Sequence, residues 1–272
     1  MSSSLRVSAN DFVASFASTP AVYTTARSLS AGSLRVFELD LHLQRLVDSS
    51  TALFKQRAPV NLKDVVRASM RQGLLSNGLY KQGACKITTV VTPGPAVATH
   101  CELLKPRKPG ERIVVGLGGH PRDNALVKDV GWVRERAAFV NPEWEETLLT
   151  DGDYVLEGSQ TNFFAVEANG VVRTAGAGML PGTVRACVLD ACASLGITVA
   201  MDYPPRVADV ELWNECFVTS TSRFVLGVDE IRWETADRGR VFGPHRPVTQ
   251  LIAEWVTRFA YDKSGNLDDA KL

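Results

Sequence analysis

Lys128 and Glu157 are the residues whose types and surroundings are most suited to chemistry. Lys128 follows Leu126 and Val127 at the end of a short strand-like run. A lysine directed inward by a strand loses hydration, so that its pKa falls and its amine becomes nucleophilic; a lysine in a solvated loop does not. Glu157 ends the apolar run YVLEG. A buried carboxylate there needs a cationic or hydrogen-bonding partner, whereas an exposed turn residue does not.

Three further features could bind an anion. In LPGTVR, Pro181 and Gly182 form a tight turn before a helix, which leaves the N–H groups of Thr183 and Val184 at a helix N-terminus. Four hydroxyl residues, 219 to 222, follow the strand-like run ECFV. Arg27 is a lone base in the strand-like run VYTTARSL. Each feature also has an ordinary explanation, as a capped helix, a loop of common composition or a surface arginine.

The elements that must position these residues alternate between helices and strands. VYTTARSL and SLRVFEL are expected to form a hairpin around Ser30–Gly32, and the strongest hairpin signal is Asn169-Gly170. Helices are expected over 39–54, 62–75, 130–140, 184–195, 207–214 and 248–262, and strands over 85–93, 112–118, 146–151, 154–158, 162–168, 171–175, 197–201 and 215–221. The pattern predicts an α+β (mixed α/β) fold in two domains, 1–117 and 128–272, joined by a linker over 118–127.

Composition restricts the function classes. The 272 residues include 30 basic and 30 acidic side chains, so no overall field favours nucleic acid or an anionic membrane. No apolar run approaches the roughly 18 residues of a membrane span. The five cysteines make no C-x-x-C pair and the four histidines show no metal spacing, which predicts reduced thiols, no metal site and a cytoplasmic location.

The motifs LEGSQTNFF, LPGTVR and FVTST occur in this order, after VYTTARSL, HLQRL and a lysine that precedes the glutamate by 29 residues (157 − 128). Together they resemble the fold-type IV pyridoxal-phosphate enzymes, which include branched-chain aminotransferase, D-amino acid aminotransferase and aminodeoxychorismate lyase. The resemblance covers about Val22 to Val228, and it implies a two-domain fold like that of D-amino acid aminotransferase.

The resemblance also implies a role for each motif residue. Lys128 would form the Schiff base with pyridoxal 5′-phosphate and move the substrate proton. Glu157 would face the pyridine nitrogen and hold its proton, which the ring needs as an electron acceptor. The remaining residues implied to bind or orient the cofactor are Arg27, Ser159, Asn162, Gly182, Thr183, Val184, Ser220 and Thr221.

The chain departs from the branched-chain enzymes at the fifth residue after the lysine, where Val133 replaces a tyrosine that contacts the cofactor's phenolic oxygen. Either Trp132 packs against the ring or another residue, such as Tyr23, covers that oxygen. Arg136 and Arg223 are candidates to clamp a substrate carboxylate in bidentate fashion, although Arg136 could equally lie on a solvated helix face.

The function expected from these residues is aminotransfer between an amino acid and a 2-oxo acid. The alternatives are an aminodeoxychorismate lyase, which releases pyruvate without an amino acceptor, and a protein that binds pyridoxal phosphate without turnover. The resemblance further implies a homodimer. The partners are then small-molecule substrates, with no nucleic acid and no membrane.

Overall fold

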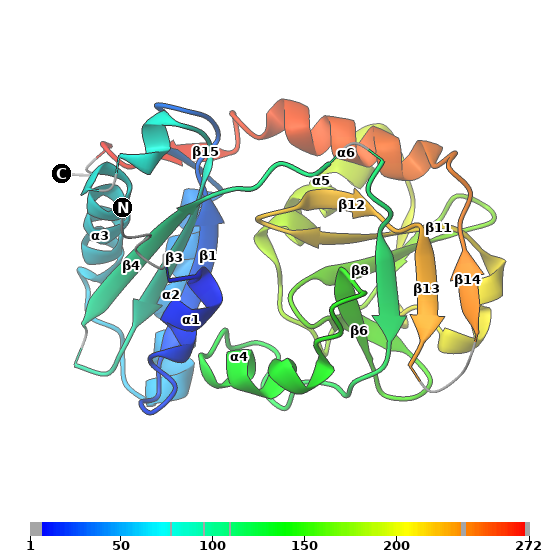
Figure 1. Cartoon of the computed structure of the whole chain (residues 1–272), viewed down its shortest axis with the longest axis horizontal. Helices are drawn as coiled ribbons and strands as arrows, with labels where there is room; N and C mark the ends of the chain where they lie inside the picture. The colour runs from blue at the N-terminus through cyan, green and yellow to red at the C-terminus, as the bar shows by residue number, and fades with distance from the viewer. Residues whose placement is uncertain (1–6, 77, 95, 109, 235–237, 270–272) are drawn as a thin grey trace, which may run out of the picture. The chain divides into compact units, whose positions relative to one another are not determined.

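The computed structural model of the chain describes residues 7–76, 78–94, 96–108, 110–234 and 238–269. It divides into two compact units. Unit 1 comprises Met1–Pro106, Val127–Glu135 and Ala260–Leu272, and unit 2 comprises Arg107–Leu126 and Arg136–Phe259. Helices and strands occur in both units (Figure 1), which confirms the predicted α+β class. In the described part of the chain, no helix is both long and apolar enough to cross a bilayer.

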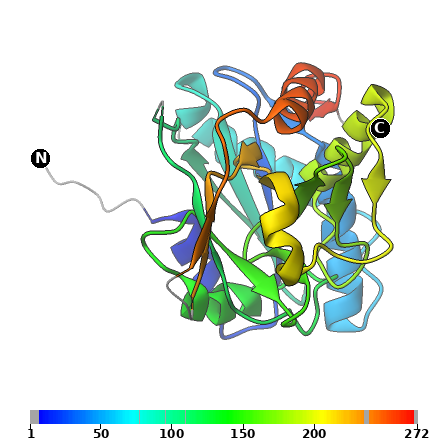
Figure 2. The ribbon, with the colours of Figure 1, turned by 90° about the vertical axis from the view of Figure 1, so that its right-hand side faces the viewer.

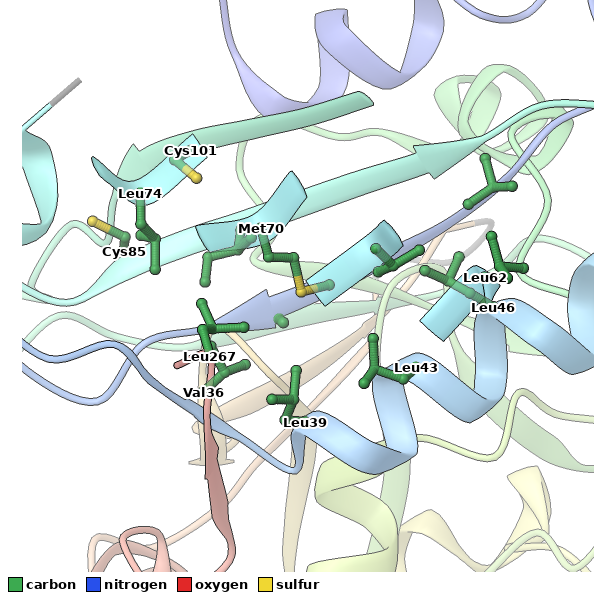
Figure 3. Packing of buried hydrophobic residues seen from close by; sticks show 14 of the residues in the cluster. Val36, Leu39, Leu43, Leu46, Leu62, Met70, Leu74, Cys85, Cys101 and Leu267 are labelled. Carbon is green, nitrogen blue, oxygen red and sulfur yellow. The ribbon is translucent and has the colours of Figure 1, made fainter. Parts of the chain in front are cut away.

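Unit 1 is built on an antiparallel sheet with the strand order β1 (Val22–Arg27), β3 (Cys85–Val91), β4 (Val97–Leu103). The helices α2 (Leu39–Phe54) and α3 (Leu62–Ser76) pack on one face and enclose the apolar cluster that Figure 3 shows. The short helix α1 (Ala9–Ala14) packs with Tyr23 and Val90 of the sheet. Successive side chains of a strand point to opposite faces of the sheet, so the side chains of Tyr23 and Thr24 lie on different faces of β1.

The expected hairpin around Ser30–Gly32 is reduced to a short antiparallel contact. β2 (Arg35–Phe37) pairs with β15 (Ser264–Asn266), and its link to the end of β1 is a single bridge between Ser28 and Val36. Both segments pair with strands that lie far along the chain. β1 pairs with β3 over its whole length, and β2 is bound to β15, where Arg35 Nε donates to Ser264 Oγ at 2.8 Å. A turn signal alone does not decide which strand a segment joins.

Unit 2 contains two five-stranded sheets. The first has the order β10 (Val199–Ala200), β9 (Val172–Thr174), β8 (Asn162–Glu167), β11 (Trp213–Ser220), β12 (Phe224–Gly227). The second has the order β14 (Gly239–Val241), β13 (Glu230–Trp233), β5 (Val114–Leu117), β6 (Glu146–Thr150), β7 (Val155–Gly158). One apolar cluster draws side chains from both sheets, including Phe163 of β8, Val115 of β5 and Ile231 of β13.

Two helices pack beside the first sheet of unit 2. α5 (Thr183–Leu195) contacts β11, and α6 (Pro247–Phe259) contacts β11, β12 and α5; Figure 2 draws α5 in yellow-green and α6 in orange-red. Phe163 and Val218 point into the apolar cluster that the two sheets share. Their neighbours Asn162 and Thr219, which are opposite each other on β8 and β11, therefore face the other way.

The shorter elements are η1 (Leu79–Lys81), α4 (Gly131–Glu135), η2 (Arg136–Phe139) and η3 (Val207–Leu212). The helix expected over 130–140 is therefore two pieces, α4 and η2, and the helix expected over 207–214 is a 3-10 helix. Helix α5 closely follows its prediction and ends at Gly196, whose φ of 69° suits a residue without a side chain.

The two units differ from the division expected at 117 and 128. β5 lies within 112–118, yet it pairs with β6 and β13 of unit 2. The segment after Val127 hydrogen-bonds to β1 of unit 1, and β15 near the C-terminus pairs with β2. Strand pairing, which joins segments distant in the sequence, sets these boundaries.

Candidate active site

Glu157 is held inside unit 2 near the end of β7. Its side chain is 4% exposed, and Oε2 accepts a hydrogen bond from the main-chain N–H of Leu180 at 3.0 Å. Oε1 lies 3.9 Å from Nη1 of Arg122, whose side chain is 5% exposed. The carboxylate thus has both the cationic neighbour and the hydrogen bond that its burial requires. Nothing in the local sequence around Glu157 indicated Arg122.

The turn after Glu157 is shaped by a second buried carboxylate, Glu146, which belongs to none of the sequence motifs. Ser159 Oγ donates to Glu146 Oε1 at 2.6 Å, and the N–H of Gln160 donates to Oε2 at 3.2 Å. A Cβ on Gly158 would lie 2.7 Å from Glu146 Cγ and 2.1 Å from Thr161 Oγ1, so only glycine fits there. Ser159 therefore stabilises the turn after Glu157, and its role toward a cofactor stays a prediction.

The segment 180–183 connects Glu157 to the start of α5. Asn162 Nδ2 donates to the carbonyl of Leu180 at 2.7 Å, and a Cβ on Gly182 would lie only 2.0 Å from Asn162 Oδ1. Gly182 occupies the N-cap position of α5, and a glycine has no side chain with which to cap the helix. The first N–H groups of α5, at Thr183 and Val184, therefore lie at a helix N-terminus, which is the kind of main-chain site that binds anions.

Hydroxyl groups gather beside this helix start. Thr183 Oγ1 lies 3.4 Å from Thr221 Oγ1, and both residues are buried. Thr219 Oγ1 is a buried hydroxyl with no hydrogen-bond partner among the described residues. Ser220 differs, because its hydroxyl accepts from the N–H of Arg223 at 3.3 Å. The donor set fits a phosphate, which can accept from hydroxyl and main-chain groups together.

The two arginines predicted to clamp a substrate carboxylate lie in different surroundings. Arg136 in η2 is buried. Arg223 Nε lies 2.5 Å from Glu145 Oε1, so an acidic side chain of the protein already occupies its fork. Their roles toward a substrate stay predictions.

Lys128 belongs to unit 1, where the main chain fixes it against β1. Its carbonyl accepts from the N–H of Tyr23 at 2.9 Å, and its own N–H donates to Ser49 Oγ at 3.3 Å. The strand expected to end here is reduced to one bridge, between Val22 and Asp129. Lys128 Nζ lies 4.7 Å from the centre of the Tyr23 ring, and the side chain is half-buried.

Burial shifts the pKa values of three basic residues of unit 1. His42 Nδ1 lies 2.8 Å from Thr24 Oγ1 in the core, and its pKa is well below 6.5 because of burial, with the charges of Arg45 and Lys128 adding to the effect. Burial lowers the pKa of Arg45 to about 10, which the phenol of Tyr23 partly opposes. Burial also lowers the pKa of Arg27 on β1.

His42 makes unit 1 sensitive to acid. Since the folded pKa is below that of the unfolded chain, its stabilising contribution is present above pH 6.5 and declines as the pH falls below that value. The loss amounts to at most about 1.4 kcal/mol of unfolding free energy per pH unit. Denaturant titrations between pH 7.5 and 5 should show this slope reduced in His42→Gln and retained in His120→Gln, an exposed histidine. An identical slope in both variants would contradict it.

The predicted residues divide between the two units. Unit 2 holds one group: Glu157, Ser159, Asn162, Gly182, Thr183, Val184, Ser220, Thr221, Arg136 and Arg223. Unit 1 holds the other: Tyr23, Arg27, Lys128 and Trp132, the last of which is buried in α4 and donates its main-chain N–H to Asp129 Oδ1. The pairing of Lys128 with Glu157 across one small heterocycle stays a prediction. Among the described residues, no three His, Cys, Asp or Glu side chains come together as metal ligands.

Comparison with known proteins gives this arrangement a context. The model of one family, described as amino-transferase class IV, matches residues 21–231. The fold is similar to that of a branched-chain aminotransferase from Thermoproteus uzoniensis with norvaline, at 20% identity over 96% of this chain and 91% of that chain, with a TM-score of 0.73. It is also similar to a branched-chain aminotransferase from Escherichia coli, at 18% identity over 92% and 90%, with a TM-score of 0.71.

A third similar structure is a hypothetical aminotransferase from Mycobacterium tuberculosis in its PLP-bound form, at 17% identity over 96% of this chain and 95% of that chain, with a TM-score of 0.70. No curated protein matches the sequence. The structural likeness shows a shared fold. The family match shows membership of the family, because it spans most of the chain and contains Lys128, Glu157 and the start of α5. The chain belongs to the class IV aminotransferase family.

Proposed function

We propose that the protein is a pyridoxal-phosphate-dependent aminotransferase that moves an amino group between an amino acid and a 2-oxo acid. The observation that carries this proposal is the segment 180–183. Its Leu180 N–H holds the Glu157 carboxylate, and its Gly182 begins α5 without a side-chain cap. Three residues of chain span at most about 11 Å. One short segment thus positions both the acid that would face a ring nitrogen and the helix start that would bind a phosphate.

The residues of unit 2 fit pyridoxal phosphate. Thr183 and Val184 would bind the phosphate through main-chain N–H groups, and Thr219 and Thr221 through hydroxyls. Glu157, kept in place by Leu180 and Arg122, would hold a proton on the pyridine nitrogen. When bound, this cofactor supplies an aldehyde that condenses with amines and a ring that accepts the electron pair of a broken Cα–H bond.

The residues of unit 1 would supply the amine and further positive charge. Lys128 would attach to the cofactor and carry the proton that leaves the substrate Cα. For the phosphate, Arg27 on β1 is the arginine that the motif implies, and Arg45 on α2 is a second arginine of the same unit whose pKa burial lowers. Trp132 lies near the lysine in the sequence, and the ring of Tyr23 lies next to its amine in space.

The test begins with cofactor attachment. Purified protein is loaded with pyridoxal phosphate, reduced with borohydride and mapped by peptide mass spectrometry. Modification of Lys128 is the expected result, and modification of Lys63, Lys81, Lys86 or Lys105 instead would overturn the site.

Loaded protein is then mixed with amino acids one at a time, and the absorbance of the bound cofactor is followed. Loss of the band with an amino acid and its return with 2-oxoglutarate or pyruvate is the result expected of an aminotransferase. Pyruvate release from aminodeoxychorismate without an amino acceptor would identify a lyase. No spectral change with any substrate would indicate a binding protein without turnover. Sedimentation of the loaded protein tests the homodimer that the resemblance implies.

A further inference from the structure

The loop from Ser220 to Phe224 joins β11 to β12 and carries Thr221, so its shape decides where the Thr221 hydroxyl lies. Ser220 and Phe224 are opposite each other at the end of the strand pair. The N–H of Arg223 closes the turn by donating to the carbonyl of Ser220 at 3.2 Å. Thr221 is buried within this turn, with its hydroxyl 3.4 Å from that of Thr183.

This loop contains a strained residue. Phe224 has a φ of 54°, in the left-handed region that bulky L residues disfavour. Such a conformation persists when surrounding contacts over-determine it. A loop with this strain needs an external anchor if the neighbouring Thr221 is to keep one position.

Arg223 provides that anchor. Its Nε lies 2.5 Å from Glu145 Oε1, its Nη2 donates to the carbonyl of Glu145 at 3.3 Å, and its Nη1 donates to Ser220 Oγ at 3.4 Å. The planar guanidinium therefore joins Ser220, the first residue of the turn, to Glu145 outside it. A planar fork with fixed donor directions is better suited to this than a flexible ammonium group.

Glu145 is itself firmly placed. Its N–H donates to the carbonyl of Val114 on β5 at 2.8 Å, and its Oε1 also lies 2.5 Å from Arg107 Nη2. Burial alone would raise the pKa of Glu145, but the guanidinium groups of Arg107 and Arg223 outweigh burial and hold the pKa below its ordinary value. The acid thus stays ionised at neutral pH, and a substrate carboxylate would have to displace it to reach Arg223.

We propose that Arg223 is a positioning residue and not the clamp for a substrate carboxylate: bound to Glu145, it fixes the loop Ser220–Phe224 so that the Thr221 hydroxyl faces the start of α5 and binds the phosphate of the cofactor. This inference rests on the proposed function, since it concerns the same phosphate site. It assigns to Glu145 and Arg107 a part in cofactor affinity that no motif indicated.

The experiment compares Arg223→Gln, the conservative Arg223→Lys and Glu145→Gln with the wild type. The dissociation constants of pyridoxal phosphate and of pyridoxal, which lacks the phosphate, are measured by absorbance titration of the apo protein. We expect Arg223→Gln and Glu145→Gln to weaken pyridoxal phosphate binding about tenfold or more and pyridoxal binding less than about twofold. Arg223→Lys should give an intermediate loss, because it keeps the charge without the fork.

Kinetics at saturating cofactor separate the two roles of Arg223. A positioning residue leaves the KM of the 2-oxo acid nearly unchanged in both glutamine variants. A rise of about tenfold or more in that KM for Arg223→Gln, with unchanged cofactor affinity and an unaffected Glu145→Gln, would overturn the proposal. Arg238→Gln is the matched control, since it removes an exposed ion pair with Glu211 at 3.2 Å in the same unit.

Hydrogen exchange of the apo proteins gives a result that does not depend on the cofactor. Amides of residues 220–224 should exchange at least about tenfold faster in Arg223→Gln and Glu145→Gln than in the wild type and in Arg238→Gln. Unchanged exchange would overturn the anchoring of the loop. If the wild type binds no pyridoxal phosphate, the proposed function fails, and the exchange rates alone decide whether Arg223 fixes the loop.

Discussion

Replacing Lys128 by arginine is expected to lower kcat for amino-group transfer by up to about 10⁴-fold. Arginine preserves the positive charge next to the Tyr23 ring, but it keeps its proton in proteins and so can neither attack a carbonyl nor accept a proton. The main-chain bonds of residue 128 to β1 and Ser49 remain available to the variant. Single-turnover transfer from an amino acid, followed as absorbance of the cofactor, measures the effect.

Lys81→Arg is the control for this experiment. Lys81 Nζ also lies near a tyrosine ring in unit 1, 6.0 Å from the centre of Tyr80, and no motif includes it. It should retain a kcat within about twofold of the wild type, as expected of a surface substitution. A Lys128→Arg protein with normal turnover would show that another amine performs the chemistry.

Replacing Glu157 by glutamine is the second large expected effect, a loss of about 10²–10³ in kcat. The amide has nearly the same shape and can still accept from the Leu180 N–H, but it carries no charge to hold a proton on a pyridine nitrogen. Arg122 would then lie beside a neutral group in a buried site, which further disfavours a protonated ring nearby. Steady-state kinetics and the absorbance of the bound cofactor report the change together.

Glu143→Gln provides a control with the same chemistry. Glu143 Oε2 lies 3.9 Å from Arg232 Nη1, the same separation as in the Glu157 pair, but its side chain is 75% exposed. Exposed pairs contribute little, so this variant should keep its activity. Equal losses in the two variants would mean that the Glu157 charge has no special role, and the account of this carboxylate would have to be abandoned.

The sequence was sufficient where the signal is local. Helix α5 could be placed because Pro181-Gly182 starts it, a regular apolar stripe follows, and Gly196 ends it. For Glu157 the local sequence left a buried and an exposed position open, and the structure shows the buried one, with a hydrogen bond from Leu180. The antiparallel pairs β6–β7 and β8–β9 followed from their short separation in the chain.

The sequence was insufficient where partners come from far along the chain. Arg122 lies 35 residues before Glu157 (157 − 122), and Glu145 lies 78 residues before Arg223, so no local pattern could join them. Glu146 had no motif, although it shapes the turn after Glu157. The strand partner of β2 is β15, more than 200 residues away, whereas the turn signal near β2 predicted pairing with the preceding strand.

The short turn from Leu180 to Gly182 has a thermodynamic consequence. The N–H of Leu180, its first residue, binds the Glu157 carboxylate, and Gly182, its last residue, is the N-cap of α5. The positions of the carboxylate and of the helix start therefore depend on the same few backbone dihedral angles. When an anionic group of a ligand orders this turn, the turn loses its conformational entropy in that one step. The heterocycle of the same ligand then binds next to a turn that is already rigid, at a smaller entropy cost. Inorganic phosphate alone would therefore preorganise the place of the ring, and the two halves of the ligand would bind cooperatively.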